Sequence, residues 1–515
     1  MPVSGARQNY ETRQSDGAHP RASPARTWLL LGAVLFIAGA VRIWGIDWGL
    51  PYVYHPDEPT NLTRVMVMLE TGDPNPHWFH YGSLIFYLNA AALGVVSVLR
   101  EIFGAVGLGG AKPPAMIALA SGVTSEWWTL VVPRAMTIAA GIGATAIIFQ
   151  TVLRVTRRHL AAAFSGLLFA MSPLAAAEGR TFTPDTYTAL FAAAAIFYSV
   201  RVYEQGLLRD YVLAGTMVGL AVGSKYNAAL VGVVVIAAHV MRQRGGLAAP
   251  SRSLLVAFCS ALAAFVITTP FAILDAGRFL ADLGFELVHY SSGHVGFEAG
   301  PTVYVTALAV SFSVGLLLVP FAFTNSRTRI PATIVGVYAL TYLGAISLFR
   351  TTFARNLMPV LPAIAMVVGL GLHGALTRFQ EHRRPVRTAI YTLCVVTLVV
   401  ASTALTFQYS SLEDREPARA WIEENVEPGA TVVTESYSPW IDGDQVDLRA
   451  VSYVVTVDPT AEWDYLLITH RGSGRFDMDP RRYQEHAAAL DSIRDHSCLE
   501  ATFPGVVEIR SRHCS

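Results

Sequence analysis

Two adjacent carboxylates, Asp57 and Glu58, stand between prolines in the run YHPDEP at residues 54–59, shortly after the first long apolar segment. A carboxylate at the start of an extramembrane loop is partly desolvated by the membrane rim and could accept a proton from an attacking hydroxyl group. The alternative is an ordinary helix start, in which Asp57 caps a helix over residues 61–70. Both side chains are therefore candidate catalytic residues.

A second polar run, EGRTFTPD at residues 178–185, lies between two apolar segments in a loop too short to form a solvated domain. It offers a cation, Arg180, and a further carboxylate, Asp185. The alternative for this pair is an internal salt bridge that brackets a turn.

Two more cations stand at the ends of apolar segments. The chain has 38 basic residues, and Lys225 and Lys112 are its only lysines. Lys225 lies at a hairpin tip, where an ammonium group could bind phosphate or simply snorkel to the membrane surface. Arg355 precedes an apolar segment and could bind phosphate in the same way or anchor that segment at the interface.

The sequence requires no metal ion or other cofactor. The pairs His77 with His80 and His289 with His294 lack the tight spacing of metal ligands on one helix. A divalent cation held jointly with Asp57 stays open as an alternative. No phosphate-binding loop, dinucleotide fingerprint or nucleophile elbow is present in a suitable position.

Composition defines the class of protein that must position these residues. Of the 515 residues, 53% are hydrophobic and only 15% are charged, against about 25% charged in soluble domains. The net charge of zero argues against a nucleic-acid partner. We therefore predict a polytopic membrane protein with about eleven transmembrane helices, because apolar runs of roughly 17–25 residues can each span a bilayer. Their centres lie near residues 36, 140, 168, 195, 217, 234, 262, 312, 340, 365 and 398.

Arginines in the short loops predict the orientation of these helices, because such residues favour the cytoplasmic side. Four clusters fall on one side if the eleven segments alternate, which places residues 1–26 in the cytoplasm as a disordered tail and the C-terminus outside. Residues 82–104 would invert this pattern if they crossed, so we expect them to be interfacial or re-entrant within an external loop over 47–128. The clusters are Arg154, Arg157 and Arg158; Arg242, Arg244 and Arg252; Arg327 and Arg329; and Arg378, Arg383, Arg384 and Arg387.

Residues 410–515 differ abruptly in composition from the transmembrane region over residues 27–409. Helical patterns at 416–424 and 480–493 alternate with strand patterns at 430–435 and 463–469, which predicts a small extracytoplasmic α/β domain. Cys498 and Cys514 both lie in this domain, where an oxidising compartment would allow a disulfide. Two free thiols are the alternative.

In this order the motifs resemble those of the GT-C glycosyltransferases that use polyprenyl-phosphate sugars, including protein O-mannosyltransferases and lipid A aminoarabinose transferases. The resemblance covers roughly residues 27–410. It implies a GT-C-type all-α membrane fold and an inverting transfer of a hexose or pentose from a polyprenyl-phosphate donor to a lipid, glycan or protein acceptor. The motifs that carry it are 57–58, Arg134, 180–185, 219–227 and 355–362.

The resemblance also implies roles for individual residues. Asp57 corresponds to the family's proposed general base, Glu58 would orient it or bind the acceptor, and Asp185 would help to shape the site. Arg180, Lys225 and Arg355 would stabilise charge on the departing phosphate. The active site would lie on the outer face of an inner or plasma membrane.

One departure concerns the late part of the first external loop. Aminoarabinose transferases carry a Lys-Pro motif there, whereas this chain has FHYG at residues 79–82. Either His80 or Tyr81 replaces the lysine as a phosphate ligand, or another loop supplies the cation.

Two other functions are compatible with many apolar helices. A flippase for lipid-linked sugars, or a secondary transporter, would show repeated halves and charges near the middle of the membrane. The sequence shows no clear internal repeat, and its charges gather at loop bases. A protein that only scaffolds envelope assembly would leave the adjacent carboxylates Asp57 and Glu58 without a role.

Overall fold

A computed structural model describes most of the chain. The predicted tail over residues 1–26 falls almost wholly outside the described residues, as do His294, Cys514 and part of the predicted 47–128 loop. The described residues are 24–105, 127–243, 252–293, 300–379, 384–410, 415–457, 462–503 and 507–512.

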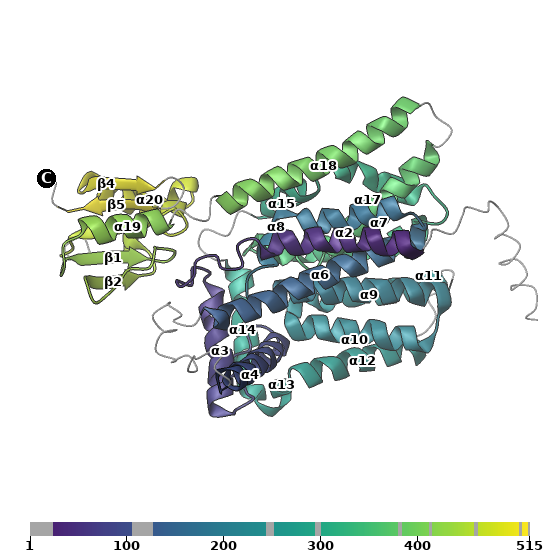
Figure 1. The fold of residues 1–515 in the computed structure, drawn as a ribbon, viewed down its shortest axis with the longest axis horizontal. Coiled ribbons are helices and arrows are strands. Elements are labelled where there is room, and N and C mark those ends of the chain that lie inside the picture. Colours follow the sequence, from purple (N-terminus) through teal and green to yellow (C-terminus); the bar gives the residue numbers. More distant parts are fainter. Residues whose placement is uncertain are drawn as a thin grey trace, which may run out of the picture.

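Helices make up the region that precedes the C-terminal domain (Figure 1). Most of them run side by side and form an elongated bundle. In chain order they are α2 (Pro24–Ile43), α3 (Asp57–Thr71), α4 (Leu84–Ala105), α6 (Trp128–Thr156), α7 (His159–Met171), α8 (Pro173–Glu178), α9 (Asp185–Gln205), α10 (Leu208–Ser224), η2 (Tyr226–Val231), α11 (Gly232–Arg242), α12 (Arg252–Thr268), α13 (Phe271–Leu274), α14 (Ala276–Ser292), α15 (Thr302–Phe312), η3 (Ser313–Phe323), α16 (Arg329–Ile346), η4 (Ala354–Leu357), α17 (Leu361–Arg378) and α18 (Arg384–Ser410).

Each of the eleven predicted membrane segments is helical, which confirms the all-α prediction for this region. Within the described part of the chain, seven helical stretches are long and apolar enough to cross a membrane. The remaining predicted segments form shorter or more polar helices. The seven are Pro24–Ile43, Leu84–Ile102, Trp128–Thr156, Thr302–Phe323, Arg329–Ile346, Leu361–Arg378 and Arg384–Thr406.

Helix α4 is the one of these seven that the arginine pattern does not require to cross. It is strongly foreshortened in Figure 1, whereas α6, α9 and α10 are seen at full length in the plane of the picture. Helix α4 therefore runs at a steep angle to them. An interfacial position for residues 82–104 therefore stays our prediction.

The two ends of the bundle differ in what they carry. Helices α3 and α14 run across one end, and the C-terminal domain lies beyond that same end (Figure 1). At the opposite end α11 and α17 finish and α12 and α18 begin. Arginines from two of the four predicted cytoplasmic clusters stand at those helix ends, so these two clusters share one end, as the sequence predicts.

Close helix packing sets the position of the end of α10. A Cβ atom on Gly215 would lie 2.0 Å from the Ala257 carbonyl oxygen of α12, and one on Gly219 would lie 2.2 Å from that of Ala261. This small-xxx-small spacing lets the two backbones approach closely, as is common in membrane helices. Lys225 follows directly after α10, so its backbone position is fixed by this contact.

The start of α3 follows from its sequence. Asp57 and Glu58 occupy its first turn, where negative charge is favoured by the helix dipole. The helix ends at Gly72, which has φ of 69° and donates its N–H to the Met68 carbonyl group. The helix over residues 61–70 is present, but the capping role considered for Asp57 is wrong, because Pro56 is the N-cap and no side chain caps the helix.

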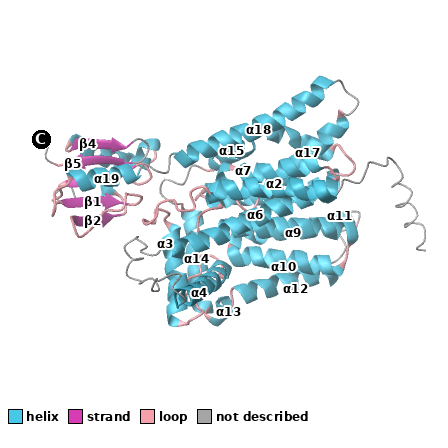
Figure 2. Cartoon of the chain, in the orientation of Figure 1, coloured by secondary structure: helices cyan, strands magenta, loops and turns pink. Residues whose placement is uncertain are grey.

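The C-terminal domain confirms the predicted α/β unit (Figure 2). Its five-stranded sheet has the order β2-β1-β3-β5-β4, in which β1 pairs in parallel with β2 and β3, and β5 pairs antiparallel with β3 and β4. Its elements are α19 (Arg415–Asn425), β1 (Thr431–Glu435), β2 (Asp447–Val451), η5 (Val454–Thr456), β3 (Tyr465–Thr469), η6 (Ser473–Met478), α20 (Gln484–Asp495), β4 (Cys498–Phe503) and β5 (Val507–Ser511).

Helices cover both faces of this sheet. Ile422 of α19 packs on the face that presents Leu467 and Ile509, and Leu490 of α20 packs on the face that presents Leu466. Two-sided burial explains the continuous apolar run in β3. Cys498 is disulfide-bonded, whereas its predicted partner lies outside the described residues.

Candidate functional site

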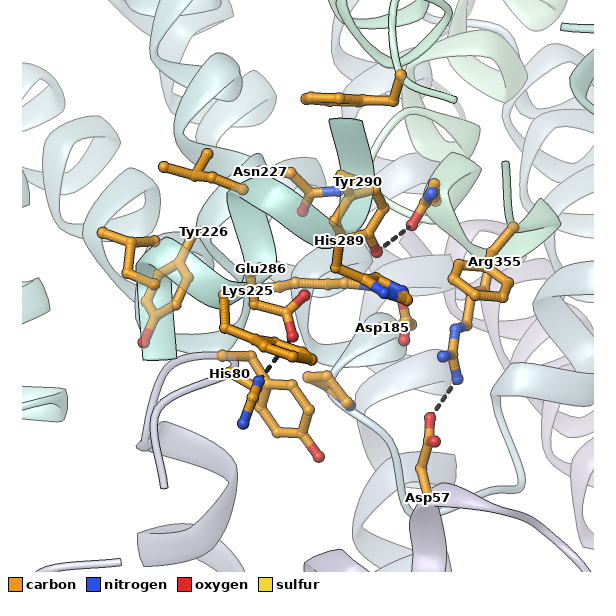
Figure 3. Close-up of a pocket in the computed structure, with 18 of the residues that line it drawn as sticks. Asp57, His80, Asp185, Lys225, Tyr226, Asn227, Glu286, His289, Tyr290 and Arg355 are labelled. Atoms are coloured by element: carbon orange, nitrogen blue, oxygen red, sulfur yellow. Dashed lines mark hydrogen bonds and ion pairs between the residues drawn. The ribbon is translucent and has the colours of Figure 1, made fainter. Parts of the chain in front are cut away.

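A cavity of about 560 Å³ opens where the bundle ends beneath the C-terminal domain. Polar side chains from α3, α9, η2, α14 and η4, and from the connections beside them, reach into it (Figure 3). These side chains are Asp57, His80, Asp185, Lys225, Asn227, Glu286, Tyr290 and Arg355. Another part of the wall is apolar, formed by Leu283, Leu287, Ile346, Phe349 and Phe353.

Asp57 and Arg355 form an ion pair inside this cavity, although 298 positions separate them in the chain. Their side chains retain 32% and 25% of their accessible surface, so a ligand can reach both groups. The guanidinium group also lies 5.1 Å from the ring centroid of Phe353. The structure thus brings the first and last motifs of the sequence together.

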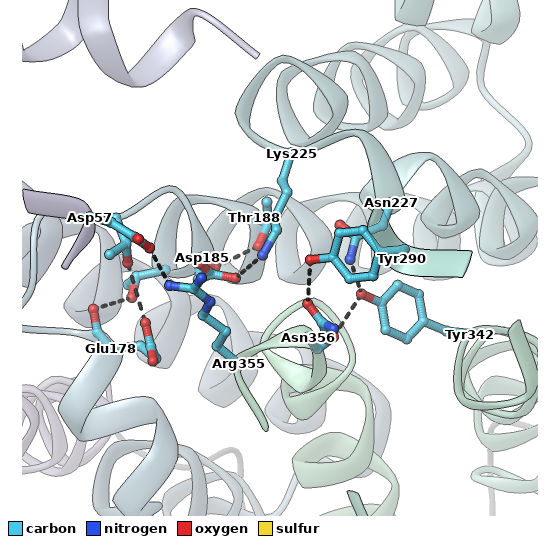
Figure 4. Close-up of polar contacts among 12 residues, drawn as sticks. Asp57, Glu178, Asp185, Thr188, Lys225, Asn227, Tyr290, Tyr342, Arg355 and Asn356 are labelled. Carbon is cyan, nitrogen blue, oxygen red and sulfur yellow. Dashed lines mark hydrogen bonds and ion pairs between the residues drawn. The ribbon is translucent and has the colours of Figure 1, made fainter. Parts of the chain in front are cut away.

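Asp185 and Lys225 form a second carboxylate–cation pair in the same cavity. The Lys225 Nζ atom lies 2.8 Å from the Asp185 Oδ1 atom, and Lys225 is 13% exposed (Figure 4). Burial opposes the charge of Lys225, but the adjacent Asp185 raises the pKa of Lys225 above its usual value. Two cations and two carboxylates therefore share one partly enclosed space.

Glu58 lies outside the cavity lining. It is completely buried in an ion pair with Arg134, with a distance of 2.6 Å from Oε2 to Nη2. Its other oxygen, Oε1, accepts hydrogen bonds from the Arg134 Nε atom and from the Phe182 backbone. Glu58 thereby joins α3 to α6 and to the 180–185 segment, which ends at Asp185.

Arg180 is also absent from the lining. It is buried, and its Nη1 atom donates to the Trp44 carbonyl oxygen at 3.3 Å. The 180–185 motif is therefore divided, because its acid faces the cavity and its arginine packs behind the wall.

His80 and Tyr81 both line the cavity, at the position where the family's lysine is missing. His80 Nδ1 lies 2.7 Å from Glu286 Oε1, and Tyr81 donates to the Asn61 side chain. A Cβ atom on Gly82 would lie only 2.0 Å from the Gly223 carbonyl oxygen. This close approach brings the 79–82 segment against the end of α10, next to Lys225.

Several polar side chains of the site were not singled out from the sequence. The Tyr290 hydroxyl group donates to Asn356 at 3.3 Å, Asn227 Nδ2 donates to the Tyr342 hydroxyl group at 3.0 Å, and Tyr342 donates to the Asn356 backbone (Figure 4). Asn227 and Asn356 lie inside motifs that the sequence did reveal. Tyr290 and Tyr342 lie in apolar or amphipathic helices and carry no such signal.

Glu178 is a further acid beside the two ion pairs (Figure 4). Its Oε2 atom accepts a hydrogen bond from Thr183 at 3.3 Å. Burial and the negative charge of Asp185 raise the pKa of Glu178 to about 7, against the opposing charges of Arg355 and Lys225. The signal for Glu178 was its place at the start of the 178–185 run.

Asp57 behaves in the opposite way. Burial alone would raise the pKa of its carboxyl group, but Arg355, with smaller contributions from His55 and Lys225, holds that pKa below its usual value. The His55 Nδ1 atom accepts the Asp57 backbone N–H at 3.2 Å. Asp57 is therefore ionised at neutral pH and neutralised by an arginine that a ligand can contact.

No cluster of three or more metal-ligating side chains occurs among the residues that the structure describes. The arrangement of charges is suited to phosphate binding and proton transfer. Two cations in a cavity with an apolar wall can hold a phosphate group attached to a hydrocarbon chain, and a neighbouring carboxylate can take a proton.

Comparisons with known proteins agree with the predicted resemblance. A family model described as dolichyl-phosphate-mannose-protein mannosyltransferase matches residues 113–273. That segment includes Asp185 and Lys225 but not Asp57 or Arg355. No curated protein sequence matches the chain.

Two solved structures of ArnT from Cupriavidus metallidurans share the fold over nearly the whole chain. The form bound to undecaprenyl phosphate aligns with a TM-score of 0.54 and 14% identity, covering 96% of this chain and 99% of that one. The apo form gives 0.53 and 14%, with coverage of 94% and 98%. The S. cerevisiae protein O-mannosyltransferase Pmt1-Pmt2 complex bound to the sugar donor gives 0.33 and 18%, with coverage of 50% and 33%.

The chain thus has the fold of the ArnT structures, which is the predicted GT-C fold. This confirms the predicted fold class, in which an apolar helical bundle carries a small C-terminal α/β domain.

Proposed function

We propose that this protein is an integral-membrane inverting glycosyltransferase that uses a polyprenyl-phosphate sugar as donor. In the reaction, an acceptor oxygen bonds to the anomeric carbon while the bond from that carbon to the phosphate oxygen breaks. The polyprenyl phosphate leaves with the bonding electrons, and the acceptor proton passes to the Asp57 carboxylate. Attack from the side opposite the leaving phosphate inverts the anomeric configuration.

The observation that carries this proposal is the pair of carboxylate–cation contacts in one cavity, Asp57 with Arg355 and Asp185 with Lys225. The donor phosphate competes with the two carboxylates for the same two cations. When Arg355 turns to the phosphate, Asp57 loses the partner that depresses its pKa and becomes a stronger base. Binding of the donor would thereby activate the base.

The leaving group needs cationic stabilisation rather than a proton, because a phosphate ester leaves as an anion. Arg355 and Lys225 supply this stabilisation, and His80 and Tyr81, which line the same cavity, contact the phosphate or sugar. The apolar wall around Phe349 accommodates the first isoprene units.

Glu58 and Arg180 act on the site indirectly in this scheme. Glu58 is a positioning residue, because its contacts with Arg134 and with the Phe182 backbone hold α3 and the Asp185 segment in place. Arg180 adds positive charge behind the wall. We place the cavity and the C-terminal domain on the extracytoplasmic side of the membrane, opposite the arginine clusters.

The test uses purified protein in detergent with a panel of radiolabelled polyprenyl-phosphate sugars and an envelope extract as acceptor source. Wild-type protein should release polyprenyl phosphate from one member of the panel and label the acceptor. Asp57→Asn should lose this turnover while its thermal unfolding stays unchanged. A donor that is bound or moved across a vesicle membrane without cleavage would instead indicate a flippase.

A further inference from the structure

A second cavity, of about 490 Å³, lies between the YHPDEP segment and the C-terminal domain. It adjoins the first cavity, since Pro56 and Tyr437 line both. The bundle contributes residues 53–56 and Pro59 to its wall, and the C-terminal domain contributes the opposite side. The two cavities therefore meet at Pro56, which directly precedes Asp57.

Arg415 is the central charge of this second cavity. Its side chain is only 7% exposed, its Nη1 atom donates to the Tyr54 carbonyl oxygen at 3.1 Å, and its guanidinium carbon lies 4.9 Å from the Tyr54 ring centroid. Among the residues that the structure describes, Arg415 has no ion pair with a carboxylate. Burying a charge without a counter-charge is costly unless a ligand supplies one.

A second arginine, Arg475, lines the same cavity and is equally buried. Its guanidinium carbon lies 5.4 Å from the Tyr453 ring centroid and 5.9 Å from that of Tyr437. Its Nη1 atom contacts the Tyr453 hydroxyl group at 3.5 Å. Its Nη2 atom donates to the Arg471 carbonyl oxygen, so aromatic and backbone contacts hold this arginine in the cavity lining.

The rest of the described lining combines hydroxyl, aromatic and apolar side chains. Three hydroxyl groups, from Ser436, Ser438 and Ser452, join the arginines, and no aspartate or glutamate belongs to the lining that the structure describes. Of the neighbouring acids, Glu416 pairs with Arg419 and accepts a hydrogen bond from the Tyr54 hydroxyl group, and Glu435 accepts hydrogen bonds from Ser473 and Thr469. The described lining of the second cavity thus carries two arginines and no carboxylate.

We infer that the second cavity is the acceptor subsite and that it binds an acceptor bearing an anionic group, a phosphate or a carboxylate, through Arg415 and Arg475. This inference rests on the proposed function, since it supplies the second substrate of that reaction. Paired guanidinium groups suit both anions because they offer several N–H donors in a fixed plane. The shared wall at Pro56 would direct an acceptor hydroxyl group toward Asp57.

The difference between the two linings assigns the donor to the first cavity and the acceptor to the second. The polyprenyl chain needs the apolar wall that Phe349 and Leu283 provide, and the second cavity contains no comparable surface. The C-terminal domain then provides specificity for the acceptor, and the bundle provides the donor site.

Binding of simple anions tests the subsite independently of catalysis. Inorganic phosphate and acetate are titrated into the full-length protein in neutral detergent, and phosphatidylglycerol nanodiscs are compared with phosphatidylcholine nanodiscs. In Arg475→Gln, the loss of one charged contact should weaken anion binding by about 10-fold to 100-fold. Arg475→Lys should restore part of it, and Arg449→Gln, at an exposed arginine on β2, should match wild type.

The class of anion follows from which of these ligands binds. Saturable binding of phosphate or acetate that requires Arg475 indicates a soluble or glycan acceptor, and binding only to phosphatidylglycerol indicates a lipid headgroup. Equal binding by wild type and Arg475→Gln in every arm would overturn the proposal. Arg415 also contacts Tyr54 of the bundle, so a change at Arg415 could alter how the C-terminal domain docks. The conservative variant Arg415→Lys is therefore tested beside Arg475→Gln, to distinguish lost anion binding from altered docking.

Transfer assays separate failure of this inference from failure of the proposed function. If the inference holds, Arg475→Gln raises the KM for the acceptor in envelope extract and leaves both donor binding and the KM for the donor unchanged. A raised KM for the donor, or an unchanged KM for the acceptor, contradicts it. If wild-type protein cleaves no donor at all, the proposed function fails, whatever the anion titrations give.

Discussion

Asp57 and Glu58 are neighbours in sequence, and each pairs with an arginine, yet the two ion pairs occupy very different surroundings. The Glu58–Arg134 pair is sealed, with exposed fractions of 0% and 1% for its side chains. The Asp57–Arg355 pair opens into the cavity, with 32% and 25% exposed. Access to a ligand, rather than residue type, separates a structural ion pair from one that can take part in chemistry.

The difference follows from helix geometry. Successive residues on a helix point about 100° apart, so when Asp57 faces the cavity, Glu58 must face the packed interior between α3 and α6. A sealed pair fixes the position of the helix, and an open pair can exchange its partner for a phosphate. The sealed pair is thus the support on which the open pair depends.

Breaking the sealed pair should produce the largest effect on stability. Glu58→Gln leaves Arg134 buried without a counter-charge, which costs about 3–5 kcal/mol. We expect a large drop in the detergent unfolding temperature, measured by differential scanning fluorimetry. Turnover per folded molecule should fall much less than in Asp57→Asn.

The matched control for this change is Asp57→Asn, which alters the neighbouring residue in the open pair. Its unfolding temperature should stay close to that of wild type. Equal destabilisation by the two substitutions would contradict the distinction between a sealed and an open pair.

Removing Lys225, the second cation of the first cavity, should have the next largest effect, in this case on turnover. Lys225→Met takes away one group that stabilises the departing phosphate, and loss of such a group typically costs about 100-fold or more in turnover. Donor cleavage is measured under saturating acceptor. Lys225→Arg should recover part of the rate, and a rate above half that of wild type in Lys225→Met would remove this residue from the mechanism.

A smaller, pH-dependent effect should come from Glu178, whose pKa is raised to about 7. As the pH rises through 7, Glu178 ionises and competes for Arg355 and Lys225, so donor affinity should fall several-fold between pH 6 and 8. In Glu178→Gln the affinity should be flat over this range. A sugar phosphodiester donor is used because its phosphate does not titrate there, and a pH slope that persists in Glu178→Gln would exclude this acid as its cause.

Much of the fold follows from patterns within single segments. Apolar runs revealed the bundle helices, and the changed composition after residue 410 revealed the α/β domain with both of its predicted strands. The distribution of arginines placed α11, α12, α17 and α18 correctly at a shared end. These features depend on local composition, which one sequence contains in full.

The sequence singled out four charged residues of the candidate site for the same reason, but it could not show how they pair, because the partners are distant in the chain. Asp57, Asp185, Lys225 and Arg355 were recognised as charges beside apolar segments, but their pairing depends on helix packing over up to 298 positions. Nothing in the motif distinguishes Asp57 from Glu58. The role of Arg134 as the partner of Glu58 was equally hidden.

The most direct test of the account is the affinity of Asp57→Asn for polyprenyl phosphate, measured beside its transfer rate. If the phosphate takes Arg355 from Asp57, removing the competing carboxylate leaves binding as tight as in wild type or tighter. Transfer should nevertheless fall by about 100-fold to 10,000-fold, because the base is gone. Weakened lipid binding in Asp57→Asn, or transfer at the wild-type rate, would contradict the exchange of partners at the centre of this mechanism.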